Sequence, residues 1–407
     1  MTLDERLELI NQVGEEIITQ EDLKALLSSD KSSNSEDKPI AYDGFEPSGQ
    51  IHIAQGILRT INVNKMTKAG IKFKMFVADW HAYANNKMGG DLQKIQTVGK
   101  YFIEVWKACG MDLANIEFVW ASDLVKDPDY WKLVLQVGKS NALKRFVRTA
   151  EMMGRAESLE NLTGAHIIYS CMQVADIFML GAKITQLGMD QRKVNMLARE
   201  VGPQLGYWKP VVVSHHMLMG LIPPAKLGAE QLYNNISTLS ESTNPPKNLT
   251  EIGSKIEEIH EEKISRVIAL KMSKSNPDSA IFMTDTKEDI KRKITKAWAP
   301  EGVVKENPLL EYCKYLIFPA LQESTIYQLQ ATSLDITRPK KFGGTKTYQS
   351  YQELEQDYAS KALHPMDLKS AVIDILDMLL QPVRKHFEEN AEAAALLKQV
   401  KTYQITR

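Results

Sequence analysis

Cysteine is scarce in this sequence, which contains only Cys109, Cys171 and Cys313. Three cysteines this far apart suit free thiols in a reducing compartment, and their spacing indicates neither a disulfide framework nor a metal site. No stretch approaches the ~20 consecutive apolar residues of a membrane-spanning helix. The acidic N-terminal residues 1–6 lack the apolar core of a signal peptide, so we expect a cytoplasmic protein without a membrane partner.

An excess of charge of one sign is also missing, because 50 basic residues face 51 acidic ones. Bulk charge therefore gives no support for binding to nucleic acid, and any such contact must come from local patches. The composition is otherwise that of a soluble globular protein, with 43% hydrophobic and 25% charged residues. A chain of 407 residues is long enough for two or three domains.

Short strand-like runs alternate with helical stretches as far as about residue 214. This alternation predicts an α/β fold, a Rossmann-like doubly wound parallel sheet. In such a sheet the ligand binds beyond the carboxyl ends of the strands, so the residues just after each strand are the candidates for a site. The strand-like runs are residues 40–42, 73–77, 116–120 and 210–214, and the clearest helices between them are 50–68 and 92–109.

Three domains follow from the pattern along the chain. Residues 1–38 are expected to form an N-terminal helical extension and loop, and residues 39–286 the α/β domain. Residues 287–407 are expected to form a separate helical domain. An irregular insertion at about 222–269 interrupts the α/β domain, and its paired prolines and many Ser and Asn residues predict an exposed segment. The sequence assigns this insertion no role.

A glycine-rich segment follows the first strand-like run and covers residues 44–56, GFEPSGQIHIAQG. Its glycines and Ser48 surround the predicted start of the helix 50–68, where backbone N–H groups and the helix dipole favour a bound phosphate. His52 is expected in the first turn of that helix, facing the same phosphate. For this segment alone, a glycine-rich turn with a surface histidine is an equally good explanation.

A second candidate segment, residues 271–275, reads KMSKS. Lys271 and Lys274 are separated by a methionine and a serine, and a cationic loop of this kind can neutralise a triphosphate as charge shifts in a transition state. A solvated basic loop is the alternative explanation. The presence of both segments in one chain favours the phosphate-binding interpretation over either alternative.

In their pairing and order, the two segments resemble the HIGH and KMSKS signatures of class I aminoacyl-tRNA synthetases. The resemblance implies a Rossmann catalytic domain, ATP with Mg²⁺ as a substrate, an aminoacyl-adenylate intermediate, and His52, Gln55, Lys271 and Lys274 as catalytic residues. Ala54 and Gln55 depart from the Gly and His of the class signature, which shifts charge stabilisation to His52 and the two lysines. The ATP-binding residues that the resemblance implies are Gly49, His52, Ala54, Met217, Leu218, Met219, Lys271, Met272, Ser273, Lys274 and Ser275; by residue type alone, the run 217–219 is more typical of core packing.

Within that class, several segments are similar to archaeal and eukaryotic tyrosyl-tRNA synthetases, and the plant-like cytosolic form shares the His52–Gln55 version of the first motif. The resemblance implies L-tyrosine as a substrate, with Tyr42 and Asp176 on its phenol. Tyr169, Gln173 and Asp176 are spaced by four and three residues, so they share one helix face. Polar side chains that satisfy one another inside a packed core are the alternative. The similar segments are 41–49, 77–83, 169–177, 187–193 and 363–369, and the implied tyrosine-binding residues are Tyr42, Gly44, Glu46, His81, Tyr169, Gln173, Asp176 and Gln191.

The same resemblance implies tRNA(Tyr) as the second substrate and a homodimer. Arg148 and Arg192 fall where the family contacts the acceptor end of tRNA. His364 and Asp367 fall where it reads the first anticodon base, and recognition of an unstacked base by side chains is the usual mode for RNA loops. The archaeal position that stacks on an anticodon base corresponds here to Leu316, with Phe318 nearby, which leaves that contact open.

A protein-bound metal is not expected. His215 and His216 are adjacent, so their side chains diverge on either a helix or a strand, and no third ligand is predicted nearby.

Two other functions fit part of the sequence. A tryptophanyl-tRNA synthetase shares the fold and the lysine loop, but an indole offers only a donor and needs no phenol-binding pair such as Tyr42 and Asp176. A non-catalytic RNA-binding relative would have no need of His52, Lys271 and Lys274. We therefore expect a tyrosine–tRNA ligase, which forms tyrosyl-adenylate and pyrophosphate and then transfers tyrosine to the 3′ end of tRNA(Tyr).

Overall fold

The computed structural model of the chain describes residues 1–29, 38–150, 163–224, 262, 265–272, 274, 276–329 and 331–403. None of the helices in these parts is both long enough and apolar enough to cross a membrane.

A six-stranded sheet with the strand order β1-β6-β5-β2-β3-β4 forms the centre of the first domain. The predicted doubly wound fold is confirmed, because every neighbouring pair except β1 with β6 is parallel. The strands are β1 (Gly14–Ile18), β2 (Ile40–Phe45), β3 (Lys72–Val77), β4 (Ile116–Trp120), β5 (Ile184–Thr185) and β6 (Val211–His215).

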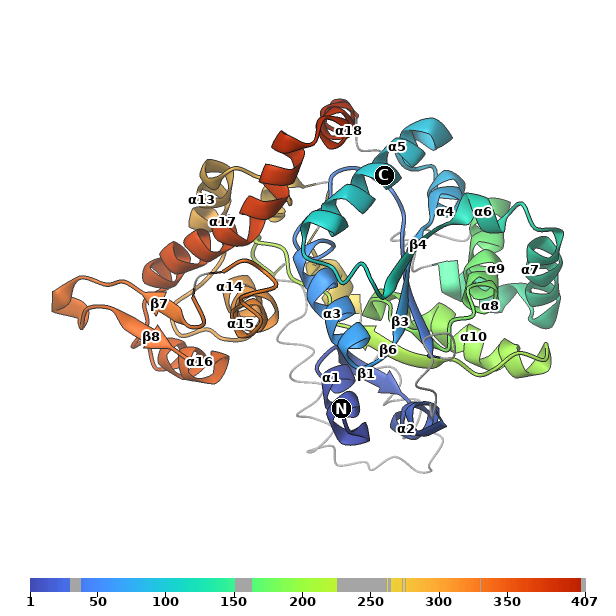
Figure 1. Cartoon of the computed structure of the whole chain (residues 1–407), viewed down its shortest axis with the longest axis horizontal. Coiled ribbons are helices and arrows are strands. Elements are labelled where there is room, and N and C mark those ends of the chain that lie inside the picture. The colour runs from blue at the N-terminus through green and yellow to red at the C-terminus, as the bar shows by residue number, and fades with distance from the viewer. Residues whose placement is uncertain are drawn as a thin grey trace, which may run out of the picture.

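Apolar side chains on the two faces of the sheet enter two different cores. Along β2, Ala41 packs into one core and Tyr42 into the other, and Met75 and Phe76 divide in the same way along β3. This is the alternation that a strand covered on both sides requires. The helices of the first core include α1 (Leu3–Asn11), α3 (Ile57–Lys68) and α5 (Leu92–Ala108), and those of the second include α7 (Pro128–Ser140), α9 (Gly164–Met179) and α10 (Arg192–Gln204) (Figure 1).

The prediction that residues 1–38 form a helical extension is wrong for its middle part. Helices α1 and α2 (Gln20–Ser29) are present, but residues 14–18 form β1, which lies antiparallel to β6 at the sheet edge. Arg199 of α10 connects residues 18–22 to the rest of the domain, because its guanidinium donates to the Ile18 carbonyl at 3.0 Å and pairs with Asp22 at 2.8 Å. Through β1, the extension therefore contributes an edge strand to the sheet of the α/β domain.

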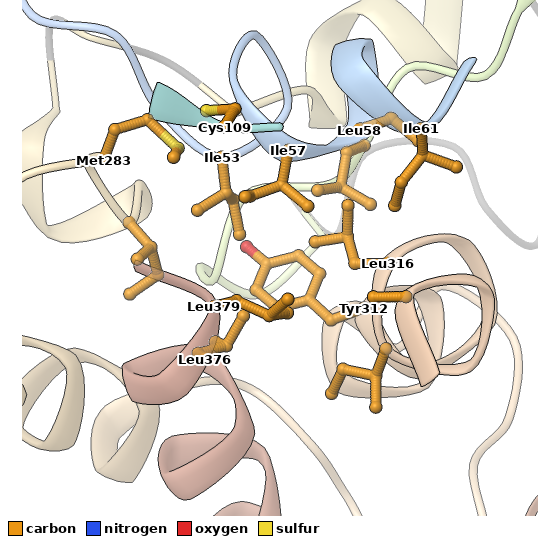
Figure 2. Packing of buried hydrophobic residues seen from close by; sticks show 14 of the residues in the cluster. Ile53, Ile57, Leu58, Ile61, Cys109, Met283, Tyr312, Leu316, Leu376 and Leu379 are labelled. Atoms are coloured by element: carbon orange, nitrogen blue, oxygen red, sulfur yellow. The ribbon is translucent and has the colours of Figure 1, made fainter. Parts of the chain in front are cut away.

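The C-terminal part is helical, as predicted, but it also contains a small two-stranded sheet of β7 (Leu334–Ile336) and β8 (Lys346–Tyr348). Its core is continuous with that of the first domain: Tyr312 and Leu316 face Ile57 and Leu58 of α3 (Figure 2). Its helices are α13 (Lys287–Lys296), α14 (Pro308–Tyr312), α15 (Phe318–Gln322), α16 (Tyr351–Ala359), α17 (Pro365–Glu389) and α18 (Ala391–Thr402), with a π-helical turn, Cys313–Ile317, between α14 and α15.

Most of the predicted insertion at 222–269 lies outside the described residues. At its edges, Ile222 is exposed, residues 265–270 are helical, and Arg266 forms an ion pair with Glu306.

Candidate active site

A cavity of about 830 Å³ lies at the carboxyl ends of the central strands, where a doubly wound sheet is expected to bind its ligand. Both candidate motifs reach it, from opposite ends of the α/β domain in sequence. The predicted residues that line it are Tyr42, Gly44, Glu46, His52, Ala54, Gln55, His81, Tyr169, Gln173, Asp176, Gln191, Met217, Leu218, Lys271, Met272 and Lys274.

The glycine-rich segment does not begin the helix as predicted. Helix α3 starts at Ile57, and His52 instead forms a β-bridge with Phe282, so it does not lie in the first helical turn. Gly49 has φ +116°, a conformation that favours glycine. A Cβ on Gly56 would lie 2.3 Å from the Met283 sulfur, so a larger residue here would displace the Met283 side chain.

This contact joins the two motifs. The Ile53 N–H donates to the Ile281 carbonyl, and the Met283 N–H donates to the Ile51 carbonyl, each at 2.9 Å. The chain that follows the lysine loop is therefore paired directly with the segment that carries His52. Proximity of the two motifs is a consequence of backbone pairing and does not need a bound nucleotide.

The start of the lysine loop is fixed to the segment after β6. The Met272 N–H donates to the Leu218 carbonyl at 3.0 Å, and Met219 forms a β-bridge with Lys271. The Lys271 ammonium pairs with Asp190 at 2.8 Å. Burial opposes ionisation of Asp190, but Lys271 outweighs it and lowers the pKa of this carboxyl.

Lys274 lies half-buried beside the first motif. Its ammonium lies 3.4 Å from the Ser48 hydroxyl and over the Phe102 ring at 4.7 Å from the centroid. Burial and the nearby Lys87 lower its pKa to about 7, although Glu46 opposes the shift. For His52, burial and then the two loop lysines hold the pKa well below its usual range, so its imidazole is neutral. A neutral imidazole can donate a hydrogen bond to a phosphate without adding another positive charge beside the two lysines.

Asp176 is at the centre of a buried polar network. The Tyr130 hydroxyl donates to its Oδ1 at 2.9 Å, and the His81 Nε2 lies 2.9 Å from its Oδ2. Burial opposes protonation of His81, but Asp176 outweighs it and raises the pKa of the imidazole. The Tyr42 hydroxyl is also buried and has no hydrogen-bond partner among the described residues. A buried hydroxyl without a partner is costly, so it marks a position that a ligand can satisfy.

A second polar group surrounds Glu46, which also lines the cavity. The Tyr169 hydroxyl donates to Glu46 at 2.8 Å, and the Asn85 amide donates to both oxygens of the same carboxylate at 3.0 and 3.1 Å. The Gln173 amide donates to Gln191 at 2.9 Å. These carboxylate and amide oxygens are acceptors suited to an ammonium group.

Several residues of the site were missed by the sequence reasoning. Tyr130 lies on α7, whose amphipathic pattern gives no sign that its tyrosine reaches Asp176. Asp190 and Lys87 also line the cavity, and in the sequence their charge is the one feature that could have suggested a role in the site. Buried Arg59 binds Asp43 at 2.7 Å behind the strand end, although α3 was predicted to be an ordinary helix.

Residues 34–253 and 265–381 match the family described as tRNA synthetases class I (W and Y). The chain is also 44% identical over 408 residues to "Tyrosine--tRNA ligase 1, cytoplasmic" of Arabidopsis thaliana, covering 100% of this chain and 90% of that protein. The chain belongs to the class I tRNA synthetases.

Two further relatives span the same length. A "Tyrosine--tRNA ligase" of Thermococcus sibiricus is 38% identical over 423 residues, covering 100% of both proteins. The crystal structure of a tyrosyl-tRNA synthetase from Pyrococcus horikoshii complexed with L-tyrosine has a TM-score of 0.79 at 36% identity, covering 98% of this chain and 100% of that one. The predicted resemblance to plant and archaeal members is confirmed.

In this class I synthetase, the remaining predicted residues lie away from the cavity lining. Gly49 and Met219 are not part of the lining, although both adjoin it in sequence. Arg192 pairs with Glu16 of β1 at 2.9 Å. The predicted Ser273 and Ser275, and the side chain of Arg148, lie outside what the structure describes.

The residues predicted to contact the anticodon lie at the start of α17. His364 is the N-cap, and its Nδ1 accepts the Met366 N–H at 3.2 Å, while Asp367 follows in the first turn. Leu316 and Phe318 are 0% and 5% exposed, so neither side chain is available to stack on a base.

Proposed function

We propose that this class I synthetase is a tyrosine–tRNA ligase, which activates L-tyrosine with ATP and transfers it to the 3′ end of tRNA(Tyr). The observation that carries the proposal is the polar end of the cavity, where the Tyr42 hydroxyl and the Asp176 carboxylate line the same space. A phenol can donate to the carboxylate and accept from the hydroxyl. An indole has only a donor and would leave Tyr42 without a partner, so tyrosine is favoured over tryptophan, as it is by the names of the full-length relatives.

The first half-reaction needs positioning and charge stabilisation rather than proton transfer. A tyrosine carboxylate oxygen forms a bond to the α-phosphorus of ATP, and the bond to the pyrophosphate oxygen breaks. Lys271 and Lys274 are placed to stabilise the phosphate charge, and neutral His52 and Gln55 to donate hydrogen bonds to it. At the other end of the cavity, Glu46 would hold the ammonium group of tyrosine together with its neighbours Tyr169, Gln173 and Gln191.

We further propose that Mg²⁺ enters with ATP and is held mainly by phosphate oxygens. Two carboxylates of the cavity already have cationic partners, since Asp43 binds Arg59 and Asp190 binds Lys271. Among the described residues, no group of three His, Cys, Asp or Glu side chains could hold a metal ion alone. When bound, Mg²⁺ would neutralise phosphate charge, beside the two lysines of the loop.

The second half-reaction requires tRNA to reach from the cavity to the C-terminal helices. We propose that Arg148 and Arg192 contact the acceptor end and that His364 and Asp367 read the anticodon. Both anticodon candidates are at the start of α17, outside the catalytic cavity. Alanine at either position should raise KM for tRNA and leave tyrosine-dependent exchange of pyrophosphate into ATP intact. Equal damage to both reactions would mean that these residues support the fold instead.

A homodimer in the cytoplasm is the proposed state of the enzyme. One relative is named cytoplasmic. Helices α7 and α8 (Leu143–Ala150) both pack against α9, and on these helices Leu135, Leu143 and Ile168 are 68%, 64% and 48% exposed. Exposed large apolar side chains are candidates for an interface. Leu135→Glu should convert the dimer to a monomer in size-exclusion chromatography with light scattering; an unchanged mass would exclude this surface.

The deciding experiment is ATP–pyrophosphate exchange measured separately with tyrosine, tryptophan and phenylalanine. Exchange should depend on tyrosine, and a Lys271→Ala Lys274→Ala variant is the matched inactive control. Exchange that depends on tryptophan would instead identify the enzyme as a tryptophanyl-tRNA synthetase, the other specificity in this family. Tyrosine binding without any exchange would point to a non-catalytic relative.

A further inference from the structure

The segment that follows β6 is attached to the C-terminal helices at Met219. The Met219 N–H donates to the Glu311 carboxylate at 3.0 Å, and the Tyr312 hydroxyl donates to the Met219 carbonyl at 3.1 Å. Glu311 and Tyr312 are the last two residues of α14, and neither lines the cavity. Both backbone polar groups of Met219 are thus engaged by one short helix of the C-terminal part.

The two side chains that bind Met219 are themselves held in place. The Tyr312 ring is buried beside Ile57 of α3, within the apolar cluster shown in Figure 2. The Glu311 oxygen that accepts the Met219 N–H also lies 3.0 Å from the His216 Nε2, and the His216 ring stacks on Tyr315 with 4.1 Å between centroids. Side chains locked by packing and by further hydrogen bonds can fix the backbone group that they bind.

On its other edge, the same segment pairs with the start of the lysine loop. The Leu218 carbonyl accepts the Met272 N–H at 3.0 Å, and the Gly220 N–H donates to the Leu270 carbonyl at 2.9 Å. Between these two bonds, Met219 and Lys271 form an antiparallel β-bridge. Backbone groups of successive residues in an extended chain point to opposite edges. Residues 218–220 therefore lie between α14 and the lysine loop and connect the two.

The position of Lys271 depends on this connection. Its backbone is paired with Met219, while its side chain is 32% exposed and contacts Asp190. The side chain can change its partner, but the place from which it reaches into the cavity is set by residues 218–220. A misplacement of about 1 Å in a catalytic group can cost ~10²-fold in rate, so the bonds that fix Met219 bear on catalysis.

We propose that Glu311 and Tyr312 are positioning residues for Lys271: they fix the backbone of Met219 and, through it, the backbone of Lys271 at the edge of the cavity. The C-terminal helices thereby contribute to the activation of the amino acid without touching either substrate of that step. This proposal rests on the proposed function, because Lys271 is taken to act on the phosphates of ATP.

The test is Tyr312→Phe in the full chain, which keeps the packed ring and removes the hydroxyl. The matched control is Tyr358→Phe in α16, because the buried Tyr358 also donates to a backbone carbonyl, that of Pro300 at 3.0 Å. The measured quantities are kcat and KM in tyrosine-dependent pyrophosphate exchange, together with Tm. Loss of one neutral hydrogen bond should lower kcat roughly 2- to 10-fold in Tyr312→Phe and leave KM for tyrosine unchanged. Tyr358→Phe should lower Tm by a similar amount and leave kcat unchanged.

Two further comparisons separate positioning from a general loss of stability. Glu311→Ala should lower kcat, and Glu311→Gln should restore most of it, because a glutamine oxygen can still accept the Met219 N–H. In a Lys271→Ala background, Tyr312→Phe should cause no further loss of kcat, because the group that it positions is gone.

Equal kcat in Tyr312→Phe and Tyr358→Phe, or the same loss from Tyr312→Phe with and without Lys271, would overturn the proposal. Absence of tyrosine-dependent exchange in the wild type would instead refute the proposed function, so the two failures are distinguishable.

Discussion

Rejection of phenylalanine, which differs from tyrosine by one hydroxyl, should depend unequally on Tyr42 and Asp176. The Tyr42 hydroxyl is neutral and has no partner among the described residues, whereas Asp176 is charged and already contacts Tyr130 and His81. A bound phenol therefore adds one neutral and one charge-assisted hydrogen bond. Because Asp176 keeps two partners when phenylalanine binds, it is not left as a bare buried charge.

The magnitudes follow from these two bonds. A neutral hydrogen bond contributes ~0.5–1.5 kcal/mol and one to a charged group ~1.5–3 kcal/mol. Tyr42→Phe should therefore lower kcat/KM for tyrosine about 2- to 10-fold, and Asp176→Asn about 10- to 150-fold. Neither substitution should change the value for phenylalanine by a comparable factor. A tyrosyl-tRNA synthetase is itself the standard example of a site built to bind a substrate hydroxyl, with discrimination of ~10⁵ against phenylalanine, and the two bonds account for part of a ratio of that size.

The assay is pyrophosphate exchange with both amino acids, and the ratio of the two kcat/KM values cancels damage common to both. Thermal unfolding supplies the control on folding: Tyr42→Phe removes a hydroxyl that lacks a partner in the described structure, so its Tm should not fall. If the tyrosine-to-phenylalanine ratio equals that of the wild type in both variants, the specificity pocket lies elsewhere.

Three further predictions concern charge in and beside the cavity. Lys271→Ala should cut adenylate formation by ~10²-fold or more with little change in the Kd for tyrosine, as measured by exchange and equilibrium binding. Since the pKa of Lys274 is about 7, ATP binding at pH ~8 should take up close to one proton in calorimetry with buffers of different ionisation enthalpy, and Lys274→Ala should abolish the uptake. His216 lies between Glu15 and Glu311 at 3.0 Å from each; burial opposes protonation, but the two carboxylates raise its pKa to about 9. The raised pKa stabilises the fold fully below the unfolded value of ~6.5, and this stabilisation is lost as pH rises through 9, so Glu311→Gln should lower Tm at pH ~6.5 and leave it unchanged above pH ~9.5.

The elements that could be predicted from sequence are those with a strong local pattern. The strand-like run 116–120 is β4 to the residue, and the amphipathic stretch 92–109 is α5 apart from its last residue. Strand β1 was missed because its residues lie between two helices and include Glu15 and Glu16, so their pairing with β6 is set by tertiary contacts. The helix predicted from Gln50 starts at Ile57 instead, because residues 51–53 pair with the chain after the lysine loop, more than 200 residues away.

The same distinction applies to the site. Residues such as His52 and Lys274 were found because each belongs to a short motif of neighbouring residues, 44–56 and 271–275. Tyr130 is 46 positions from Asp176, and only the packing of α7 against α9 brings its hydroxyl to that carboxylate. Contacts of this kind have no signature in a single sequence.

The two lysines of the loop differ in how they are held, and this difference suggests separate tasks. Lys274 is half-buried, with its ammonium 3.4 Å from the Ser48 hydroxyl and over the Phe102 ring, so it lies beside the first motif before ATP binds. Lys271 pairs with Asp190, but its side chain is 32% exposed, and partly exposed ion pairs contribute only ~0–1 kcal/mol. A hydrogen bond to a charged group is worth ~1.5–3 kcal/mol, so a phosphate oxygen can displace Asp190 from Lys271. We infer that Lys274 helps to bind ATP in the ground state, whereas Lys271 moves to the phosphates as their charge shifts, and that the Asp190 pair holds it in place until then.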